Sequence, residues 1–363
     1  MALAISTPVH ETNLHLDPNE ASDLCPVFDR DVLDANGWDR AFVTVLDESA
    51  AEGAIAVLGH AHGSEPGEGW TAQRVHARPT AGKGRTEDAE ACARRDGSIY
   101  LFGSQFGKKA GPLSARRSWI ARVAESSLAE ALAGGEATLE IARMRFGLHR
   151  AVNEALVEAG VDLVPLGPAA QEAYIDTTVA IGERKSKRWA GRVKPLDHPL
   201  NVEAAEFRRD GRLLLGLRYP VTAEGHPILV ELDDVDAIFL DPDSVPACSG
   251  VWVLDDVGTE REPAGFRGLH THGDDRFNAV VGDLDAPDKG ATVLEDHPQG
   301  ARTGSHHVRF ALPATGAGGR LTSELVHDFE DVRRVEGVVV EGGHAYYVLD
   351  EEGHVALRTL VFD

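Results

Sequence analysis

Short apolar runs separated by Gly, Asp, Asn and Pro dominate the hydrophobic pattern of this chain. Most runs are four to seven residues long, which is the length of a strand rather than of a helix. Eleven runs predict strands: 41–46, 55–58, 98–102, 213–217, 228–232, 251–254, 279–281, 308–312, 338–340, 345–349 and 356–362. We therefore expect an all-β fold built mainly from antiparallel strands.

Helical periodicity is confined to the middle of the chain. Residues 126–132 and 146–159 repeat apolar side chains at every third or fourth position, and glycines follow both stretches. We expect a helical and basic insertion around residues 125–195. Its basic part contains Arg184, Lys185, Lys187, Arg188, Arg192 and Lys194. These residues form either a solvated loop or a rim that binds acidic groups.

A hairpin unit recurs along the chain. Each copy has an apolar strand, a turn with Asp or Gly, and a second strand that returns. The clearest copies begin near residues 89, 202 and 335, and weaker ones begin near 22 and 266. The three clear copies carry a glutamate near the start of the first strand, namely Glu90, Glu203 and Glu336.

Units that recur at intervals of tens of residues, without alternating helices, indicate a β-propeller. At about 40–50 residues per blade, about six blades account for most of the chain. We expect a single propeller domain over residues 1–363, with the segment 125–195 inserted in it. The alternative is a pair of β-sandwiches whose hairpins are alike by chance.

Two stretches of the repeat resemble a known family. They are 88–104, with Asp88-Ala89-Glu90 and Tyr100-Leu101-Phe102-Gly103-Ser104, and 199–221. The family is an uncharacterised bacterial group of β-propellers, akin to the phytase-like (esterase-like) and SdiA-regulated propellers, and the resemblance covers roughly residues 20–363. The chain departs from the family at Ala204, where a glycine is usual. The resemblance implies the propeller fold and does not assign a reaction.

The recurring glutamates are the main candidates for chemistry. If the hairpins align, Glu90, Glu203 and Glu336 converge at one mouth of an axial channel, with Arg267 at the equivalent place of a weaker copy. Carboxylates gathered at one axis must raise their pKa values, pair with cations or bind a metal. Oxygen ligands suit Ca²⁺ or Mg²⁺. The alternative is structural: each glutamate bonds to the backbone of the neighbouring blade.

Other polar residues accompany these glutamates. Asp88 and Asn201 stand two residues before a glutamate and therefore share its strand face. Arg218 can clamp an anion with its planar fork or pair with a channel glutamate. His270 and His272 share one face of a strand and can offer two imidazoles to a ligand or metal.

Composition and missing motifs argue against several classes of partner and chemistry. Asp and Glu number 59 against 36 Lys and Arg, for a net charge of −23, which argues against nucleic-acid and membrane partners. No apolar run approaches the roughly 18–20 residues that span a bilayer, and the N-terminus does not resemble a signal peptide. We therefore expect a cytoplasmic protein. Nucleotide-binding loops, the Gly-x-Ser-x-Gly elbow and His-Glu-x-x-His are absent from the sequence.

Two functional hypotheses follow. The first is a propeller that binds a small or anionic ligand, or a protein partner, at the channel mouth through Asp88, Asn201, Arg218, Arg267 and His270. The second is a metal-assisted ester or phosphoester hydrolase of phytase-like type. In that case Glu90, Glu203 and Glu336 act as catalytic groups and, with His272, as ligands of Ca²⁺ or Mg²⁺. We favour the first because no nucleophile–base pair is visible; the oligomeric state is left open.

Overall fold

The computed structural model describes residues 9–16, 20–47, 49–80, 85–108, 110–285, 290–330, 332, 334–351 and 354–361. Strands in these ranges form five sheets of four or five strands. Each of the eleven predicted runs overlaps a strand; Phe362, at the end of the last run, lies outside the described residues. The fold is therefore mostly β, as the hydrophobic pattern predicts.

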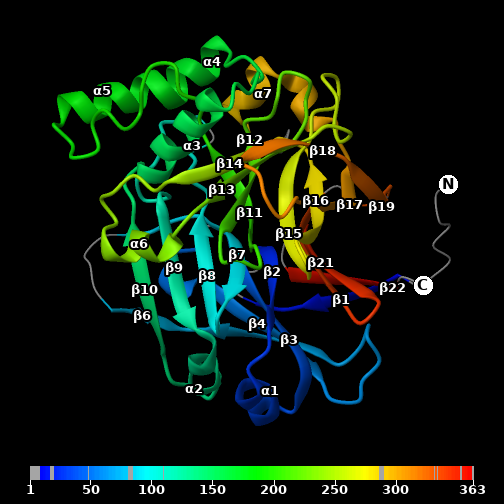
Figure 1. Ribbon diagram of the computed structural model, residues 1–363. Helices are drawn as coiled ribbons and strands as arrows, with labels where there is room; N and C mark the ends of the chain where they lie inside the picture. Colours follow the sequence, from blue (N-terminus) through cyan, green and yellow to red (C-terminus); the bar gives the residue numbers. More distant parts are fainter. Residues whose placement is uncertain are drawn as a thin grey trace.

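We number the sheets I to V along the chain and name the strands of each sheet in their spatial order (Figure 1). Sheet I contains β2 (Ala21–Val27), β3 (Trp38–Leu46), β4 (Ile55–Ala61) and β5 (Trp70–Val75). Sheet II contains β7 (Ala89–Arg95), β8 (Ser98–Gly103), β9 (Trp119–Ala124), β10 (Ala137–Arg143) and β6 (Ala77–Pro79). Sheet III contains β11 (Asn201–Phe207), β12 (Leu213–Tyr219), β13 (Ile228–Leu232), β14 (Cys248–Leu254) and β18 (Gly318–Leu321).

Sheet IV contains β15 (Gly265–Gly273), β16 (Arg276–Gly282), β17 (Ser305–Ala311) and β19 (Ser323–Phe329). Sheet V contains β20 (Val335–Glu341), β21 (His344–Glu351), β22 (His354–Val361) and β1 (His10–Leu14). Sheet V thus joins both ends of the chain, because β1 pairs antiparallel with β22; Figure 1 shows them side by side. Every recurring hairpin of the sequence is the first pair of strands of one sheet.

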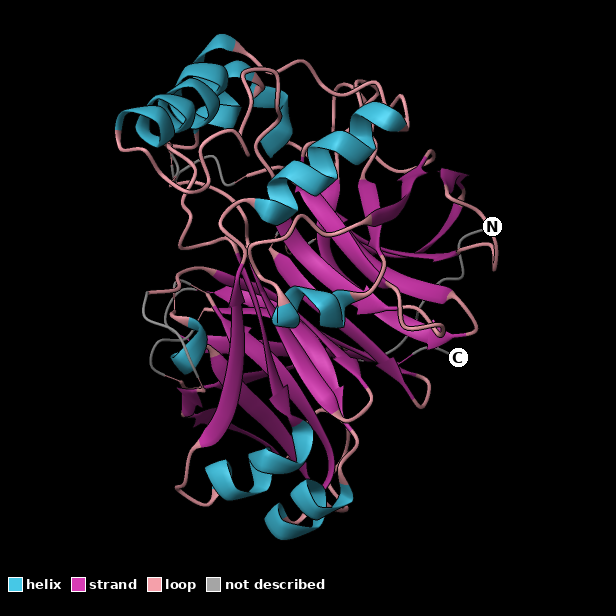
Figure 2. Ribbon diagram, turned by 60° about the vertical axis from the view of Figure 1, so that its left-hand side comes forward, coloured by secondary structure: helices cyan, strands magenta, loops and turns pink. Residues whose placement is uncertain are grey.

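The helices are short and lie outside the sheets. They are α1 (Arg30–Asn36), η1 (Ala51–Gly53), η2 (Glu125–Ser127), α2 (Leu128–Leu132), α3 (Gly147–Glu158), α4 (Pro168–Ala170), the π-helical η3 (Gln171–Asp176), α5 (Thr177–Arg184), α6 (Val235–Leu240), α7 (Thr292–Asp296) and η5 (Pro298–Ala301). In both ribbon views α4, α5 and α7 lie beyond one end of the strands, and α1 and α2 beyond the other (Figure 2). No described helix is long and apolar enough to cross a membrane.

The first strands of the five sheets contact one another in a ring. Strand β2 contacts β7, β7 contacts β11, β11 contacts β15, β15 contacts β20, and β20 contacts β2. The backbones approach closely there, since a Cβ atom on Gly268 would lie 2.7 Å from the Cα of Gly337, and one on Gly337 would lie 2.6 Å from the Cα of Asp23. Glycine is needed at both positions because any side chain would meet backbone.

A separate hydrophobic core fills the space between each pair of neighbouring sheets. Each core takes alternate residues of two sheets, which accounts for the run of buried residues in the inner strands. Representative buried pairs are Val43 with Leu101, Phe102 with Leu215, Leu229 with Phe277, Val280 with Tyr347, and Tyr346 with Phe42. The five cores therefore continue around the whole ring.

Two details differ from the expectation of six blades and an insertion over residues 125–195. Five sheets are described, because residues 144–200 form helices and loops rather than another sheet. Strand β10 belongs to sheet II because it pairs with β9, and alternate residues such as Ala137 and Leu139 are buried. The predicted helix over 126–132 is confirmed as η2 and α2, but β10 separates it from the longer helical segment, which begins at α3. A further buried cluster joins it to the loops after β8 and β16 through Tyr174, Phe106 and Leu284.

Candidate functional site

An extra residue interrupts the pairing of each first hairpin near the start of its inner strand. In four sheets this residue is Glu90, Glu203, Arg267 or Glu336, each skipped in the register between its two neighbours. Sheet I has the corresponding irregularity between Ser22 and Cys25. A β-bulge bends its strand and re-aims a side chain. The recurring glutamate of the sequence is therefore the bulged residue. The bulge lets its side chain point in a direction that the regular alternation of the strand would not give it.

The bulged side chains line a common cavity, which we call the axial cavity. Its empty volume is about 860 Å³, part of it open to solvent. The starts of the inner strands provide one part of the lining, namely Ala21, Ser22, Asp88, Glu90, Asn201, Glu203, Arg267 and Glu336. Loops and strand ends provide the other part, namely Glu20, Asp47, Phe106, Gly107, Arg117, Arg218, Asp283, Asp285 and Arg334.

Glu203 is a firmly held carboxylate of the cavity. It is 4% exposed and accepts hydrogen bonds from Asn201 Nδ2 and Arg218 Nη1, both at 2.8 Å. Arg267 Nη1 lies 3.2 Å from its other oxygen. Arg218 therefore pairs with a channel glutamate, which is one of the two roles considered for it.

The two arginines extend this pairing to other sheets. Arg267 also forms an ion pair with Glu336, and Arg218 forms one with Asp283 at 2.8 Å. Both guanidinium groups are at most 11% exposed. Acids from several sheets are thus bridged by two buried cations, which compensates for bringing the acids together.

Glu90 has different surroundings and is partly exposed to the cavity. Its Oε2 accepts a hydrogen bond of 3.4 Å from the Ser22 hydroxyl. Burial raises the pKa of Glu90 well above its ordinary value, and the charges of Asp47, Asp88 and Glu203 raise it further, with only Arg218 opposing them. Glu90 therefore tends to keep its proton.

The pKa of Glu203 moves the other way. Burial alone would raise it, but Arg218 and Arg267 outweigh burial, so that the pKa lies below its ordinary value. Glu90 and Glu203 occupy the same bulge position in neighbouring sheets, yet one favours the neutral and the other the ionised form. A neutral acid beside a fixed carboxylate is the arrangement used for acid–base chemistry.

A second group of acids meets at Glu90. Ligand atoms of Asp47, Asp88 and Glu90 all lie within 4.8 Å of one another, a spacing that can hold a metal ion. Asp88 also accepts a hydrogen bond from Ser104 and pairs with Arg117 at 2.7 Å.

The metal ligands predicted from the sequence are therefore not grouped as expected. Among the described residues, Glu90, Glu203 and Glu336 do not form a group whose ligand atoms all lie close enough to hold one metal ion. The reason is that arginines already compensate Glu203 and Glu336.

His270 and His272 lie away from the axial cavity, contrary to the prediction that places them with the glutamates. They line a second cavity, formed by the far ends of the inner strands together with Glu206, Arg94 and Val340. Position along the strand explains the difference, because the bulges lie near the start of each strand and the histidines near the end of β15. Burial lowers the pKa of His270 to about 4 and keeps its imidazole neutral.

The structural role considered for the three glutamates, a hydrogen bond to the backbone of the neighbouring sheet, is seen for two other acids. Asp23 Oδ2 accepts a hydrogen bond of 3.0 Å from the Cys92 amide of sheet II. Glu206 Oε2 accepts one of 2.9 Å from the Thr271 amide of sheet IV. These two acids link neighbouring sheets through backbone groups, whereas Glu203 is held by side chains.

Sequence reasoning missed several acids of the cavity. Asp47 directly follows β3 and Asp283 directly follows β16, where the hairpin returns to the end that carries the bulge. The sequence 283–290 is rich in Asp but lacks the spacing of an EF-hand calcium loop, so it predicts an ordinary turn. An acid just after the second strand of a hairpin is the signal that would have found both residues, because antiparallel strands bring that position beside the start of the first strand.

Comparisons with known proteins assign this chain to no family. No family model matches the chain, and no curated protein matches its sequence. Among solved structures, the chain is similar to a mannose phosphorylase from Leishmania mexicana in complex with phosphate, with 10% identity, coverage of 98% of this chain and 89% of the other, and a TM-score of 0.41. It is also similar to a glycosyl hydrolase from Bacteroides ovatus, with 10% identity, coverage of 94% and 84%, and a TM-score of 0.39.

Proposed function

We propose that the five sheets are the blades of one propeller and that the axial cavity is a hydrolytic site. The ring of inner strands and the five inter-sheet cores support the propeller. The single observation that carries the activity is the pair Glu90 and Glu203, whose pKa values are driven in opposite directions within one cavity.

The charge of the cavity points to the substrate class. Eight carboxyl groups and four guanidinium groups line it, so an anion such as a phosphoester is repelled even with Glu90 neutral. A ligand rich in hydroxyl groups suits the cavity better, because each hydroxyl can donate to a carboxylate and accept from an arginine. We therefore propose a neutral, sugar-like substrate in preference to the anionic ligand considered from the sequence.

The proposed reaction is hydrolysis of a glycosidic C–O bond. Glu90 donates its proton to the leaving oxygen as the bond breaks, and the ionised Glu203 stabilises the positive charge that develops on the sugar. Water supplies the new C–O bond, and its proton passes to an ionised carboxylate of the cavity. No serine or cysteine nucleophile is required.

Chromogenic glycosides with good and poor leaving groups test this proposal. Glu90→Gln should lower kcat/KM about 10²–10⁴-fold for a poor leaving group, which needs the acid. It should lower kcat/KM much less for dinitrophenol, which needs little protonation. Glu140→Gln removes a partly exposed carboxylate that pairs with Arg122 away from the cavity and should leave both rates unchanged. An equal loss on both substrates, or no cleavage of any glycoside by the native protein, would contradict the proposal.

A metal-assisted hydrolase is the second candidate, supported by the spacing of Asp47, Asp88 and Glu90. A Ca²⁺ or Mg²⁺ ion bound there would ionise Glu90 and so remove the general acid. The two candidates therefore exclude one another at Glu90. Elemental analysis of the purified protein, with activity measured before and after EDTA, distinguishes them: the acid mechanism expects no bound Ca²⁺ or Mg²⁺ and no loss of activity with the chelator.

A further inference from the structure

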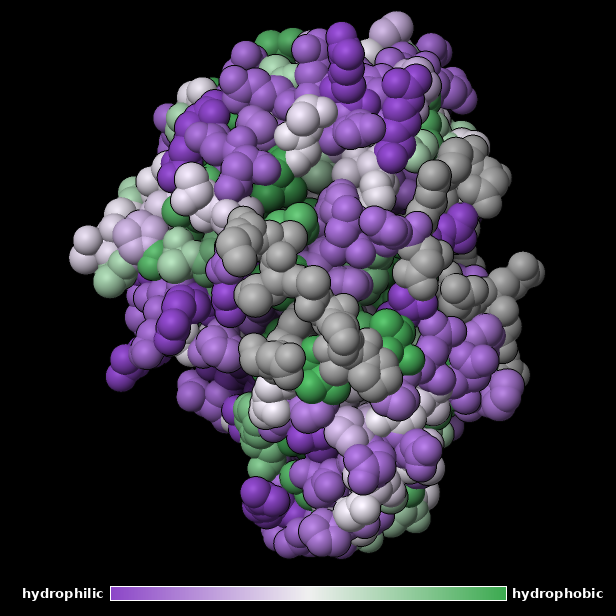
Figure 3. Space-filling model, turned by 90° about the vertical axis from the view of Figure 1, so that its right-hand side faces the viewer, coloured by the Kyte–Doolittle hydropathy of each residue, from purple (hydrophilic) through white to green (hydrophobic). Residues whose placement is uncertain are grey.

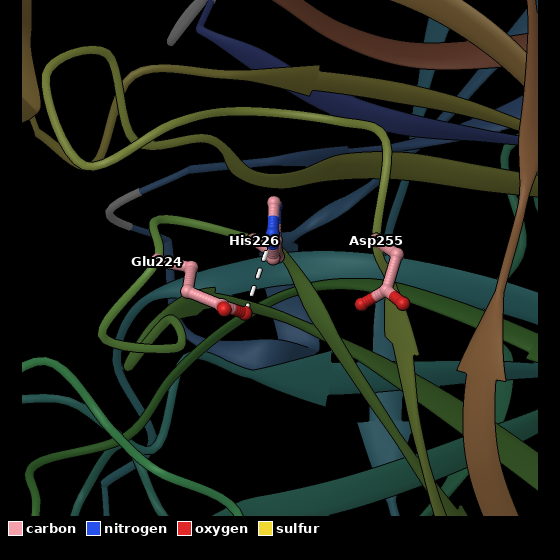
Figure 4. A group of neighbouring side chains, drawn as sticks. All are labelled: Glu224, His226 and Asp255. Atoms are coloured by element: carbon pink, nitrogen blue, oxygen red, sulfur yellow. Dashed lines mark ion pairs between the residues drawn. The ribbon is translucent and has the colours of Figure 1, made fainter.

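A second cluster of ligand-type side chains lies away from the axial cavity, on sheet III. Glu224 and His226 belong to the loop between β12 and β13, and Asp255 directly follows β14. Their ligand atoms all lie within 4.8 Å of one another. Figure 4 shows the three side chains together, with the Glu224–His226 pair, 3.6 Å between Oε2 and Nε2, drawn as a dashed line.

The hydrogen bonding of His226 fixes which nitrogen is available. Nδ1 lies 2.9 Å from the carbonyl oxygen of Val257, and a carbonyl can only accept, so Nδ1 carries the proton. The nitrogen left for a metal is therefore Nε2, which lies on the side of Glu224. A histidine that ligates a metal typically donates its other nitrogen to a carbonyl or carboxylate in this way.

The loop also holds His226 in place. The amide of His226 donates to the Thr222 hydroxyl at 3.0 Å, and the amide of Thr222 donates to the His226 carbonyl at 3.0 Å. The His226 side chain is only 14% exposed. The imidazole is thus oriented before any ligand arrives, which reduces the entropic cost of binding.

Arg320 of β18 now supplies the positive charge of this cluster. Its Nη1 lies 3.1 Å from Glu224 Oε2 and also pairs with Asp255. The guanidinium is 56% exposed, and exposed ion pairs contribute little stability. Arg320 can therefore leave the two carboxylates at small cost when another cation takes its place.

We propose that Glu224, His226 and Asp255 form a Zn²⁺ site in which the metal exchanges with the guanidinium of Arg320. One imidazole nitrogen and two carboxylates, completed by water, are a ligand set that Zn²⁺ accepts. Ca²⁺ and Mg²⁺ are excluded by the nitrogen ligand, since they prefer oxygen. The two carboxylates neutralise the ion, so the exchange leaves a solvated arginine and no unbalanced charge.

Zinc titration of the metal-stripped full-length protein against a chromophoric chelator tests the proposal. The native protein should bind one Zn²⁺ per chain at this site. His226→Gln should weaken binding at least tenfold, and Arg320→Gln, which removes the competing cation, should tighten it several-fold. His62→Gln, at an exposed histidine, is the matched control and should change nothing. If His226→Gln does not fold by circular dichroism, Asp255→Asn replaces it with the same expectation.

Two results would overturn the site. One is unchanged zinc affinity in both Arg320→Gln and His226→Gln. The other is loss of zinc binding in Glu90→Gln but not in His226→Gln, which would assign the ion to the axial cavity. Co²⁺ absorption gives an independent readout, because the visible bands of a low-coordinate site with one nitrogen ligand should disappear with His226→Gln. None of these outcomes depends on glycoside hydrolysis.

Discussion

Replacing Glu203 by glutamine probes the ion pairs at the centre of the axial cavity without changing the shape of the side chain. Breaking a buried ion pair typically costs about 3–5 kcal/mol, because a buried charge loses its partner. In this cavity the cost should be smaller, since Arg218 keeps Asp283 and Arg267 keeps Glu336. We expect a loss of about 2 kcal/mol in the free energy of unfolding at pH 7, which lowers the Tm of a chain of this size by about 3 °C.

The pH dependence makes this prediction sharper. The pKa of Glu203 is lowered by folding, so its ionised form stabilises the protein above the ordinary pKa of 4.5, and this stabilisation is lost as the pH falls through the folded value. The difference between native protein and Glu203→Gln should therefore be equal at pH 7 and 5.5 and should shrink below about pH 4.5.

Thermal unfolding followed by circular dichroism at several pH values measures this difference. Glu324→Gln is the control, because it removes one partner of an ion pair of equal length, 2.8 Å, that is largely exposed; it should cost less than about 1 kcal/mol. A Glu203→Gln protein as stable as the native one at pH 7, or a difference that persists unchanged at pH 3.5, would refute the reasoning.

Two further predictions concern the inner strands. Gly337→Ala should cost about 1–3 kcal/mol and lower the Tm by about 1–4 °C, because the new Cβ would lie 2.6 Å from the Cα of Asp23. Gly304→Ala, with nothing within 4 Å of its Cβ, should have little effect. Equal Tm values for the two variants would argue against direct contact of β20 with β2. Burial raises the pKa of Glu206 to about 7 from an ordinary 4.5, so the folded protein keeps a proton that the unfolded chain releases, and it loses up to about 3 kcal/mol of stability as the pH rises from 4.5 to 7. Urea unfolding at pH 5 and pH 8 should show a smaller change in the free energy of unfolding for Glu206→Gln than for the native protein. An equal change in both proteins would contradict the raised pKa of Glu206.

Half of the strands of this protein can be predicted from the sequence, because each of the eleven apolar runs overlaps one of the 22 described strands. Apolar runs such as 213–217 and 228–232 mark strands because each is buried on both faces and ends at turn residues. The repeat also places Glu90, Glu203, Glu336 and Arg267 in equivalent positions, since the same local arrangement recurs in each hairpin. These features are local, and local pattern is enough to find them.

Features that depend on tertiary contacts are not predictable in this way. The parallel edge strands β6 and β18 are distant in sequence from the strands with which they pair. They therefore belong to no hairpin, and the sequence contains no turn pattern that predicts their pairing. The pairing of Arg267 with Glu203 and Glu336 is set by the packing of different sheets. For the same reason His270, on the strand of Arg267, is not recognisable from the sequence as lining the opposite cavity.

Outside the cavity, the face drawn in Figure 3 is mostly hydrophilic, with hydrophobic residues in small separate patches. Exposed large side chains such as Val157, Leu196 and Leu240 come from different segments of the chain. A protein partner therefore stays a prediction from the sequence, and the axial cavity is the better-supported place for a ligand.

The four bulged positions each place a charged side chain in the cavity but are skipped in the pairing of the strands around them. A substitution at such a position leaves the hydrogen bonds of its hairpin unchanged and alters only what faces the ligand. The chain already illustrates this, because arginine occupies in β15 the place that glutamate occupies in β7, β11 and β20. New specificities are thus accessible by exchanging these residues one at a time, provided that ionised acids such as Glu203 and Glu336 keep a cation beside them.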